Sequence, residues 1–275
     1  MFRDHLRKIT QRKNLTADEM ADMIGEVFTG TVPDALIGAF MAALATKGET
    51  FEELAGAARA MRRKAARIQV SAPAVVDTCG TGGDGTGTFN ISTTTAFVVA
   101  GCGVSVAKHG NRSVSSRCGS ADLIEALGVN LNAPPDLVEE AVAEIGIGFL
   151  FAPLYHGAMK HAAAARKELG IRSIFNMIGP LTNPAGADCQ LLGVYAPQLT
   201  EMFAEALRLL GSRRALVVHG LDGLDEISVC APTRVTELKD GLIRTYDIDP
   251  ERFLGRRAAP AEVAGGDPAR NAEIT

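Results

Sequence analysis

A glycine-rich stretch between a strand-like segment and a helix-like segment constrains the fold of this chain most. Five of the eight residues from Gly80 to Gly87 are glycine, and they follow the apolar pair Val75-Val76. The next segment, from Ser92, begins with several hydroxyl side chains and becomes apolar. A glycine loop at a helix N-terminus binds anions, because free backbone N–H groups and the positive end of the helix dipole converge there. The stretch therefore predicts a phosphate-binding turn.

Two well-known phosphate loops do not fit this stretch. Residues 80–85 match G-x-G-x-x-G, but residues 100–108 lack the carboxylate that binds the ribose in a dinucleotide site. A nucleoside triphosphatase loop ends in Gly-Lys-Ser/Thr, and Gly85-Thr86-Gly87 has no lysine. We therefore expect neither a dinucleotide domain nor a triphosphatase.

From Val75 onward, short β-branched runs alternate with helical patterns, which favours a mainly parallel sheet covered by helices. Ligands bind such sheets beyond the carboxyl ends of the strands, so the motifs that follow strands should converge in one cleft. Two late strands around Lys239-Asp-Gly241 are expected to form an antiparallel hairpin at one edge. The expected strands are 104–106, 148–151, 190–195, 215–219, 234–238 and 242–246, and the expected helices are 120–127, 135–145, 156–169 and 198–210.

Residues 1–70 predict a separate unit made of helices. Pro33 fits the first turn of a helix, and the helix after it, 35–44, is apolar nearly all round. Ordinary packing within the chain, or burial against a second copy or the larger domain, would each explain that composition. The expected capping boxes are Thr16 with Glu19 and Thr50 with Glu53.

The predicted fold class is therefore α/β, with a small N-terminal helical domain plus a larger domain with a mainly parallel sheet covered by helices. The predicted domains are 1–70 and 71–275.

Composition excludes several functional classes. A net charge of −4 argues against general nucleic-acid binding. The five cysteines show neither C-x-x-C spacing nor clustering with histidine, so we expect no zinc site and no disulfides, which suits the cytoplasm. Cys79 and Cys118 lie beside the expected binding site, where we expect them to be packing residues rather than nucleophiles. The N-terminus is charged, and the most apolar run, 96–107, is shorter than the roughly 20 residues of a membrane span, so no membrane association is predicted.

Five motifs, in order along nearly the whole chain, resemble the signatures of the anthranilate phosphoribosyltransferase family. This family belongs to glycosyltransferase family 3 and shares its fold with class-II nucleoside phosphorylases, in which the residues after Lys-His differ from those here. The motifs are Asp77-Thr-Cys-Gly-Thr-Gly-Gly-Asp84, Lys108-His-Gly-Asn-Arg112, the segments 166–176 and 179–184, and Asp222-Gly-Leu-Asp-Glu226.

The resemblance implies an enzyme of tryptophan biosynthesis. It would join the amino group of anthranilate to C1 of 5-phosphoribosyl 1-pyrophosphate and release pyrophosphate. Two alternatives are another phosphoribosyltransferase or nucleoside phosphorylase of the same fold, and a non-catalytic relative that binds nucleic acid. The resemblance also leads us to expect a homodimer that forms through the N-terminal helical domain.

The resemblance places the phosphoribosyl donor at the glycine loop, the following helix start and the Lys108 motif. Asp84 is expected to organise the pyrophosphate site, and Ser120 to contact phosphate or to cap the helix after it, or both. The implied donor-binding residues are Gly80, Gly83, Asp84, Thr88, Asn90, Ile91, Ser92, Thr93, Lys108, His109, Gly110, Asn111, Arg112, Ser113, Val114, Ser115, Ser116 and Ser120.

For the acceptor, anthranilate, the resemblance implies Gly80, Asn111 and Arg166. On its helix, Arg166 could equally form a surface ion pair. No general base is assigned, because an aniline nitrogen attacks in its neutral form and positioning can suffice. His109 and His156 remain open between catalytic and packing roles.

The resemblance also implies Mg²⁺, as two ions, held by Asp225, Glu226 and the Ser92 hydroxyl. Mg²⁺ prefers one or two carboxylates together with substrate oxygens and water. As isolated residues, two adjacent acids after the strand at 215–219 would more often be an ordinary surface pair. Their position at a strand end and the motif favour the metal site.

The sequence departs from the family at two places. Gly157 stands where the family usually has proline, which puts a detail of the acceptor pocket in doubt. The chain ends at Thr275, whereas the family continues for about sixty further residues, so we expect a truncated C-terminal end and a lower stability than that of an extended chain.

Overall fold

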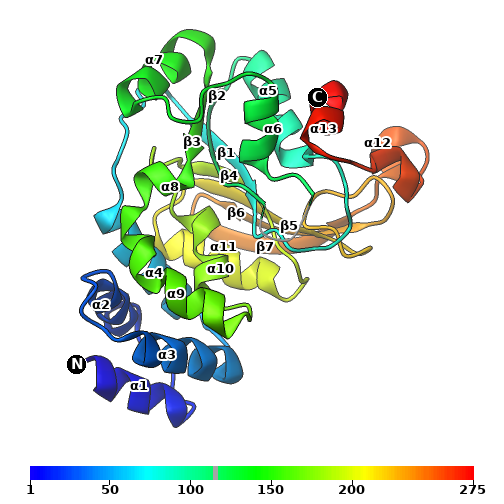
Figure 1. Ribbon diagram of the computed structural model, residues 1–275. Helices are drawn as coiled ribbons and strands as arrows, with labels where there is room; N and C mark the ends of the chain where they lie inside the picture. Colours follow the sequence, from blue (N-terminus) through cyan, green and yellow to red (C-terminus); the bar gives the residue numbers. More distant parts are fainter. Residues whose placement is uncertain (114–116) are drawn as a thin grey trace.

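The computed structural model describes residues 1–113 and 117–275, which form a helical unit packed beneath a sheet-containing unit (Figure 1). The helices of the first unit are α1 (Phe2–Thr10), α2 (Ala17–Val27), α3 (Asp34–Lys47) and α4 (Phe51–Lys64).

Local signals in the sequence account for the ends of these helices. Both expected capping boxes are confirmed: the Thr16 hydroxyl accepts from the Glu19 N–H at 3.2 Å, and the Thr50 hydroxyl accepts from the Glu53 N–H at 3.3 Å. The prediction for Pro33 is wrong by one position. Its ψ of 145° is extended, so Pro33 is the N-cap of α3 rather than part of its first turn.

The larger unit contains one seven-stranded sheet in the order β3-β2-β1-β4-β5-β6-β7. The first five strands pair in parallel, whereas β6 and β7 form the expected antiparallel hairpin at one edge. Asp240 and Gly241 have positive φ and form its two-residue turn, as the twist of a hairpin favours. The strands are β1 (Val75–Gly80), β2 (Ser105–Gly110), β3 (Ile147–Phe151), β4 (Cys189–Gly193), β5 (Arg214–Gly220), β6 (Thr233–Lys239) and β7 (Leu242–Ile248).

Helices lie on both faces of this sheet (Figure 1). The helix expected at 156–169 begins later than predicted, at Lys160, because Gly157–Met159 form a separate 3₁₀ turn. The helices of this unit are α5 (Ile91–Gly101), α6 (Ser120–Ala126), α7 (Pro135–Ile145), α8 (Ala152–Tyr155), α9 (Lys160–Leu169), α10 (Ile174–Met177), α11 (Leu199–Leu209), α12 (Glu251–Leu254) and α13 (Pro268–Ile274).

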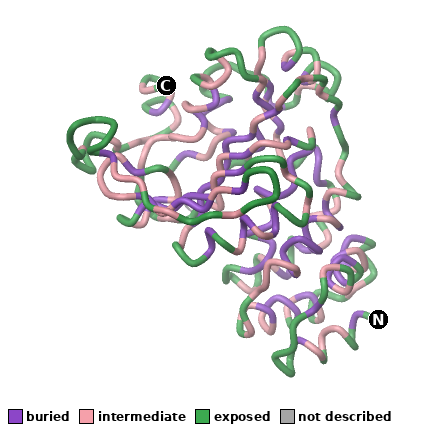
Figure 2. The backbone as a smooth tube through the Cα atoms, turned by 180° about the vertical axis from the view of Figure 1, so that it is seen from behind, coloured by how far each residue is buried: buried purple, intermediate pink, exposed green. Residues whose placement is uncertain are grey.

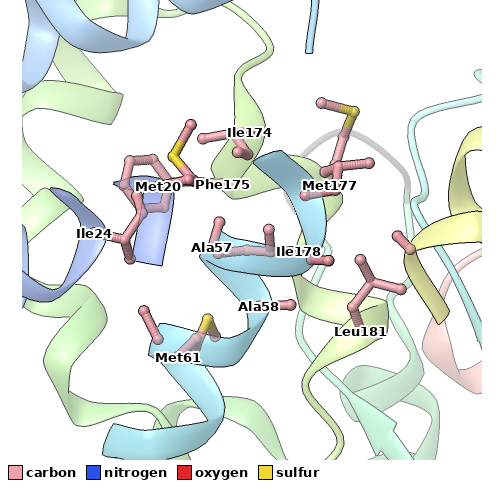
Figure 3. Packing of buried hydrophobic residues seen from close by; sticks show 14 of the residues in the cluster. Met20, Ile24, Ala57, Ala58, Met61, Ile174, Phe175, Met177, Ile178 and Leu181 are labelled. Carbon is pink, nitrogen blue, oxygen red and sulfur yellow. The ribbon is translucent and has the colours of Figure 1, made fainter. Parts of the chain in front are cut away.

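One apolar core passes through both units. Side chains of α2 and α4 pack against α10 and the turn after it, and Figure 3 shows Met20, Ala57 and Ile178 in this contact. The apolar helix α3 contacts α1, α9 and α10, so packing against the larger unit accounts for its composition. The buried segments in Figure 2 run accordingly from the helical unit into the sheet.

Among the described residues, no helix combines the length and apolar character needed to cross a bilayer.

Candidate functional site

The glycine loop begins at the carboxyl end of β1, as predicted. The Thr81 N–H donates to the Gly193 carbonyl at 2.9 Å, which continues the pairing of β1 with β4. The loop then turns through several residues in the left-handed backbone conformation, which glycine adopts without strain. The glycines with positive φ are Gly82, Gly83, Gly85 and Gly87.

The segment after β5 lies directly over the ends of β1 and β4. A Cβ atom at Gly193 would overlap the carbonyl of Asp225, and one at Gly80 would lie 2.9 Å from its Oδ2 atom. The two glycines therefore allow the backbone of the acidic segment to approach the strand ends. There the Asp225 carboxylate accepts from the Gly82 N–H at 2.8 Å.

The carboxylate of Glu226 meets the start of α5. Its Oε1 atom accepts from the Ser92 N–H at 3.0 Å, within the first turn of that helix. Burial, and next the neighbouring Asp225, raise the pKa of Glu226 to about 8. Burial, and next Asp84, raise the pKa of Asp225 to about 6. Neighbouring acids therefore repel one another here, and a bound cation would relieve that repulsion.

The donor set fits Mg²⁺, since carboxylate and hydroxyl oxygens are the ligands that this ion prefers. Asp225, Glu226 and Ser92 lie together as the sequence predicted. Within residues 1–113 and 117–275, no group of three or more His, Cys, Asp and Glu side chains forms a site by itself. Further ligands would therefore be oxygens of the substrate or of water.

Lys108 and His109 follow each other in β2 and point to opposite faces of the sheet, as successive strand residues do. The Lys108 ammonium lies beneath α5, where it donates to the Thr78 carbonyl and to the Ser92 hydroxyl, the latter at 3.4 Å. It is only 2% exposed, and burial lowers its pKa. Asp77 and Glu226 are the carboxylates close enough to act on its charge.

His109 pairs with His156 on the other face. Their Nε2 atoms lie 3.2 Å apart, and both rings are buried. Burial lowers the pKa of His109 to about 3 and that of His156 to about 4. Both imidazoles are consequently neutral near pH 7.

Asn111 and Ser120 are held together where β2 ends and α6 begins. The Ser120 hydroxyl accepts from the Asn111 N–H and donates to its carbonyl, both at 3.2 Å. The N-cap of α6 is Gly119, so a capping role for Ser120 is wrong, because Ser120 is already the first helical residue. The Arg112 guanidinium forms ion pairs with Asp122 and Glu125, at 2.9 and 2.8 Å.

Arg166 lies half-buried on α9 with its guanidinium 5.9 Å from the centre of the Phe175 ring. Burial lowers its pKa. The alternative of a surface ion pair finds no support among the described residues, where no carboxylate pairs with Arg166.

Two further residues contact the glycine loop and the start of α5, and the sequence did not single them out. Arg172 donates to the Gly83 carbonyl and stacks on Tyr195, 4.1 Å from the ring centre. Arg172 lies inside the 166–176 motif, which was the available signal. Asn271 donates to the Asn90 side chain at 2.9 Å and had no signal in the sequence.

The other predicted donor-site residues lie along the same loop and helix start. Thr88 directly follows the glycine loop, and Gly110 is the last residue of β2. Ile91 and Thr93 belong to the first turn of α5. The Ser113 N–H donates to Asp122. Val114, Ser115 and Ser116 lie outside the described residues.

A glycine loop, the start of a helix and a buried acid pair thus meet at the ends of parallel strands, above a helical unit. Family models match accordingly: the glycosyl transferase family helical bundle domain over residues 3–65 and the α/β domain of that family over residues 72–275.

Relatives and solved structures narrow the family further. The anthranilate phosphoribosyltransferase of Syntrophobacter fumaroxidans is 74% identical over the whole of this chain and 82% of its own length, and that of Desulfosudis oleivorans is 70% identical over 81% of its length. The Thermus thermophilus enzyme superposes with a TM-score of 0.92 at 46% identity, over 98% of this chain and 80% of that one. The chain belongs to the anthranilate phosphoribosyltransferase family, and it is accordingly a pentosyltransferase.

A yeast neighbour shows ligands for this fold. The Saccharomyces cerevisiae enzyme in complex with PRPP (5-phosphoribosyl 1-pyrophosphate) and Mg superposes with a TM-score of 0.89 at 29% identity, over 99% of this chain and 79% of that one.

Proposed function

We propose that this chain transfers the 5-phosphoribosyl group from 5-phosphoribosyl 1-pyrophosphate to the amino group of anthranilate. The products are N-(5-phosphoribosyl)anthranilate and pyrophosphate, and the reaction is a step of tryptophan biosynthesis. The observation that carries the proposal is the meeting of the glycine loop, the start of α5 and the buried Asp225–Glu226 pair at the ends of parallel strands.

The donor would lie across the glycine loop and the first turn of α5. Backbone N–H groups of the loop and the buried ammonium of Lys108 offer positive potential to the pyrophosphate. Charge develops on the leaving pyrophosphate as its bond to C1 breaks, so groups that stabilise this charge contribute most to the rate. Mg²⁺, which we propose as two ions held by Asp225, Glu226 and Ser92, supplies such charge when bound.

The acceptor would lie near Gly80, Asn111 and Arg166. The half-buried guanidinium of Arg166 is suited to the carboxylate of anthranilate, since planar guanidinium groups bind carboxylates in a bidentate manner. The aniline nitrogen is already neutral, so the site needs to orient it rather than to deprotonate it. His109 and His156 pair with each other, and we assign neither as a base.

A direct assay tests the reaction. We expect the fluorescence of anthranilate to decrease when the protein, the phosphoribosyl donor and Mg²⁺ are combined, with one pyrophosphate released for each anthranilate consumed. Fluorescence that stays constant, together with transfer to another acceptor in a panel of bases, would instead support a different phosphoribosyltransferase. Tight binding to single-stranded DNA at moderate salt, without transfer, would support the nucleic-acid-binding alternative.

The homodimer through the N-terminal helices and the cytoplasmic location stay predictions.

A further inference from the structure

A late segment of the chain packs on the far half of the glycine loop. Thr88 forms an antiparallel bridge with Ala264, and the Gly265 N–H donates to the Gly87 carbonyl at 2.9 Å. The Phe89 N–H in turn donates to the Val263 carbonyl at 3.1 Å. This pairing brings α13, drawn in red in Figure 1, next to α6.

Asn271 on α13 lies at the centre of this contact and is only 1% exposed. Its Oδ1 atom accepts from the Gly266 N–H at 2.7 Å, and its Nδ2 atom donates to Asn90 Oδ1 at 2.9 Å. The Asn90 amide then donates from Nδ2 to the Cys118 carbonyl at 3.0 Å.

Asn90 is the N-cap of α5, but its side chain makes no capping hydrogen bond. Asparagine at this position usually accepts a hydrogen bond from the N–H two or three residues further on. Here the Asn90 side chain instead accepts from Asn271 and donates to the Cys118 carbonyl. The side chain of Asn90 is therefore turned away from the N–H groups of the first turn, which stay available to other acceptors such as Glu226 or a phosphate.

We propose that Asn271 is a positioning residue for the phosphoribosyl donor. Through Asn90 and Cys118 it fixes the first turn of α5 relative to the start of α6. These are the two arms of the donor site, so the inference rests on the proposed function and names a residue that controls its geometry.

Asn271→Asp tests this with little change in size. The new carboxylate keeps an acceptor for the Gly266 N–H, but it places an oxygen against Asn90 Oδ1. The Asn90 amide can then pair with residue 271 only by releasing the Cys118 carbonyl. We expect roughly ten- to hundredfold weaker binding of 5-phosphoribosyl 1-pyrophosphate with Mg²⁺ in calorimetric titration without acceptor, because small misplacements at a site cost this much. At saturating donor, the KM for anthranilate should stay within about twofold of wild type.

Arg270→Ala is the matched control, because it removes an exposed ion pair with Glu273 from the same helix. It should bind the donor as the wild type does. If Asn271→Asp does not fold, Asn271→Ser is measured in the same way, since it also removes the donor to Asn90.

The outcomes separate the inference from the function. Unchanged donor affinity in the folded Asn271 variant overturns the inference, as does an equal rise in the KM of both substrates, which a general loosening of the fold would produce. A wild-type protein that does not bind the donor overturns the proposed function itself. Donor binding by the wild type that weakens in the variant supports the inference, whichever acceptor the enzyme uses.

Discussion

The carboxyl groups of Asp225 and Glu226 are held in place by backbone rather than by a cation. Each accepts from an N–H group, that of Gly82 or of Ser92. Their raised pKa values reflect burial together with the repulsion between neighbouring acids. A divalent ion would relieve that repulsion, so the pair should matter for turnover far more than for folding.

The double variant Asp225→Asn with Glu226→Gln tests this. Turnover at limiting Mg²⁺ should fall by a factor of about 100 or more, because the charge that stabilises the leaving pyrophosphate is lost. The thermal midpoint of the metal-free protein should stay the same or rise, since the amides remove a repulsion. Rates near those of wild type at limiting Mg²⁺ would contradict the metal site.

Arg166→Ala addresses the acceptor. We expect the KM for anthranilate to rise about tenfold or more, with a smaller change in the KM for the donor, because the loss of a charged hydrogen-bond donor costs about 1.5–3 kcal/mol. Steady-state kinetics with each substrate varied in turn measures both constants. Lys167→Ala, at the exposed neighbouring position, is the control. A change confined to the donor would place Arg166 in the phosphate half of the site.

Single residues mark the limit of what the sequence could predict. Gly80, Ser92, Lys108 and the acid pair could be predicted because their motifs follow strands that end at one edge of the sheet. Asn271 could not be predicted, because it meets Asn90 across 181 residues of chain and follows no motif. The ion pairs of Arg112 with Asp122 and Glu125 could not be predicted either. The packing of α6 decides which carboxylates face the guanidinium.

At the scale of elements, periodicity predicted the strands, the edge hairpin and the capped helices. It did not separate the 3₁₀ turn at Gly157–Met159 from α9, because both patterns place apolar residues three or four apart. The sequence did not predict that Lys108 and His109 would lie on opposite faces of the sheet. The Lys108-His109 motif serves two faces of one sheet, with the ammonium beneath α5 and the imidazole against His156.

The histidine pair between β2 and the C-terminal end of α8 predicts a pH dependence of stability. The pKa values of about 3 and about 4 are lowered from the ordinary value of 6.5, so the unfolded chain binds protons that the folded protein does not. The contribution of the two histidines to the free energy of unfolding should therefore be complete above pH 6.5 and be lost as the pH decreases from 6.5 toward 4 and 3. For each histidine, the free energy of unfolding should fall by up to about 1.4 kcal/mol for each unit of decrease in pH.

Urea unfolding of the wild type and of His156→Gln at pH 7, 6 and 5 measures this slope. The variant should lose less stability than the wild type between pH 7 and pH 5. Parallel pH profiles for the two proteins would show that the pair does not titrate on unfolding.

At the scale of the whole molecule, an aromatic series links the helical unit to Arg166, which we propose binds the acceptor. Phe2 and Phe175 each pack edge-on against Phe40, with ring centres 6.1 and 6.5 Å from it. The Arg166 guanidinium in turn lies over the Phe175 ring. Arg62 adds a second link, donating from α4 to the Leu181 carbonyl at 2.7 Å. We therefore expect the two units to unfold together.

Phe40→Ala tests this coupling. Phe40 is fully buried, so the cavity should cost about 3–5 kcal/mol of unfolding free energy. Calorimetry should still show one transition at a lower temperature, and the KM for anthranilate should rise because Phe175 loses its support. Val98→Ala, at an exposed position on α5, should change neither the transition temperature nor the KM for anthranilate. Two resolved transitions would show that the units are independent.

The pairing of the glycine loop with residues 263–265, and of Asn90 with Asn271, also dictates the order of assembly. A ribosome delivers the glycine loop and α5 early, but their partners emerge about 180 residues later. At 5–20 residues per second, that interval is roughly 10–40 seconds. Until residues 263–271 have docked, the far half of the loop and Asn90 lack the contacts that hold them in place. Contacts this distant in sequence also form slowly. Tight donor binding should therefore arise only after residues 263–271 have folded onto the loop and Asn90.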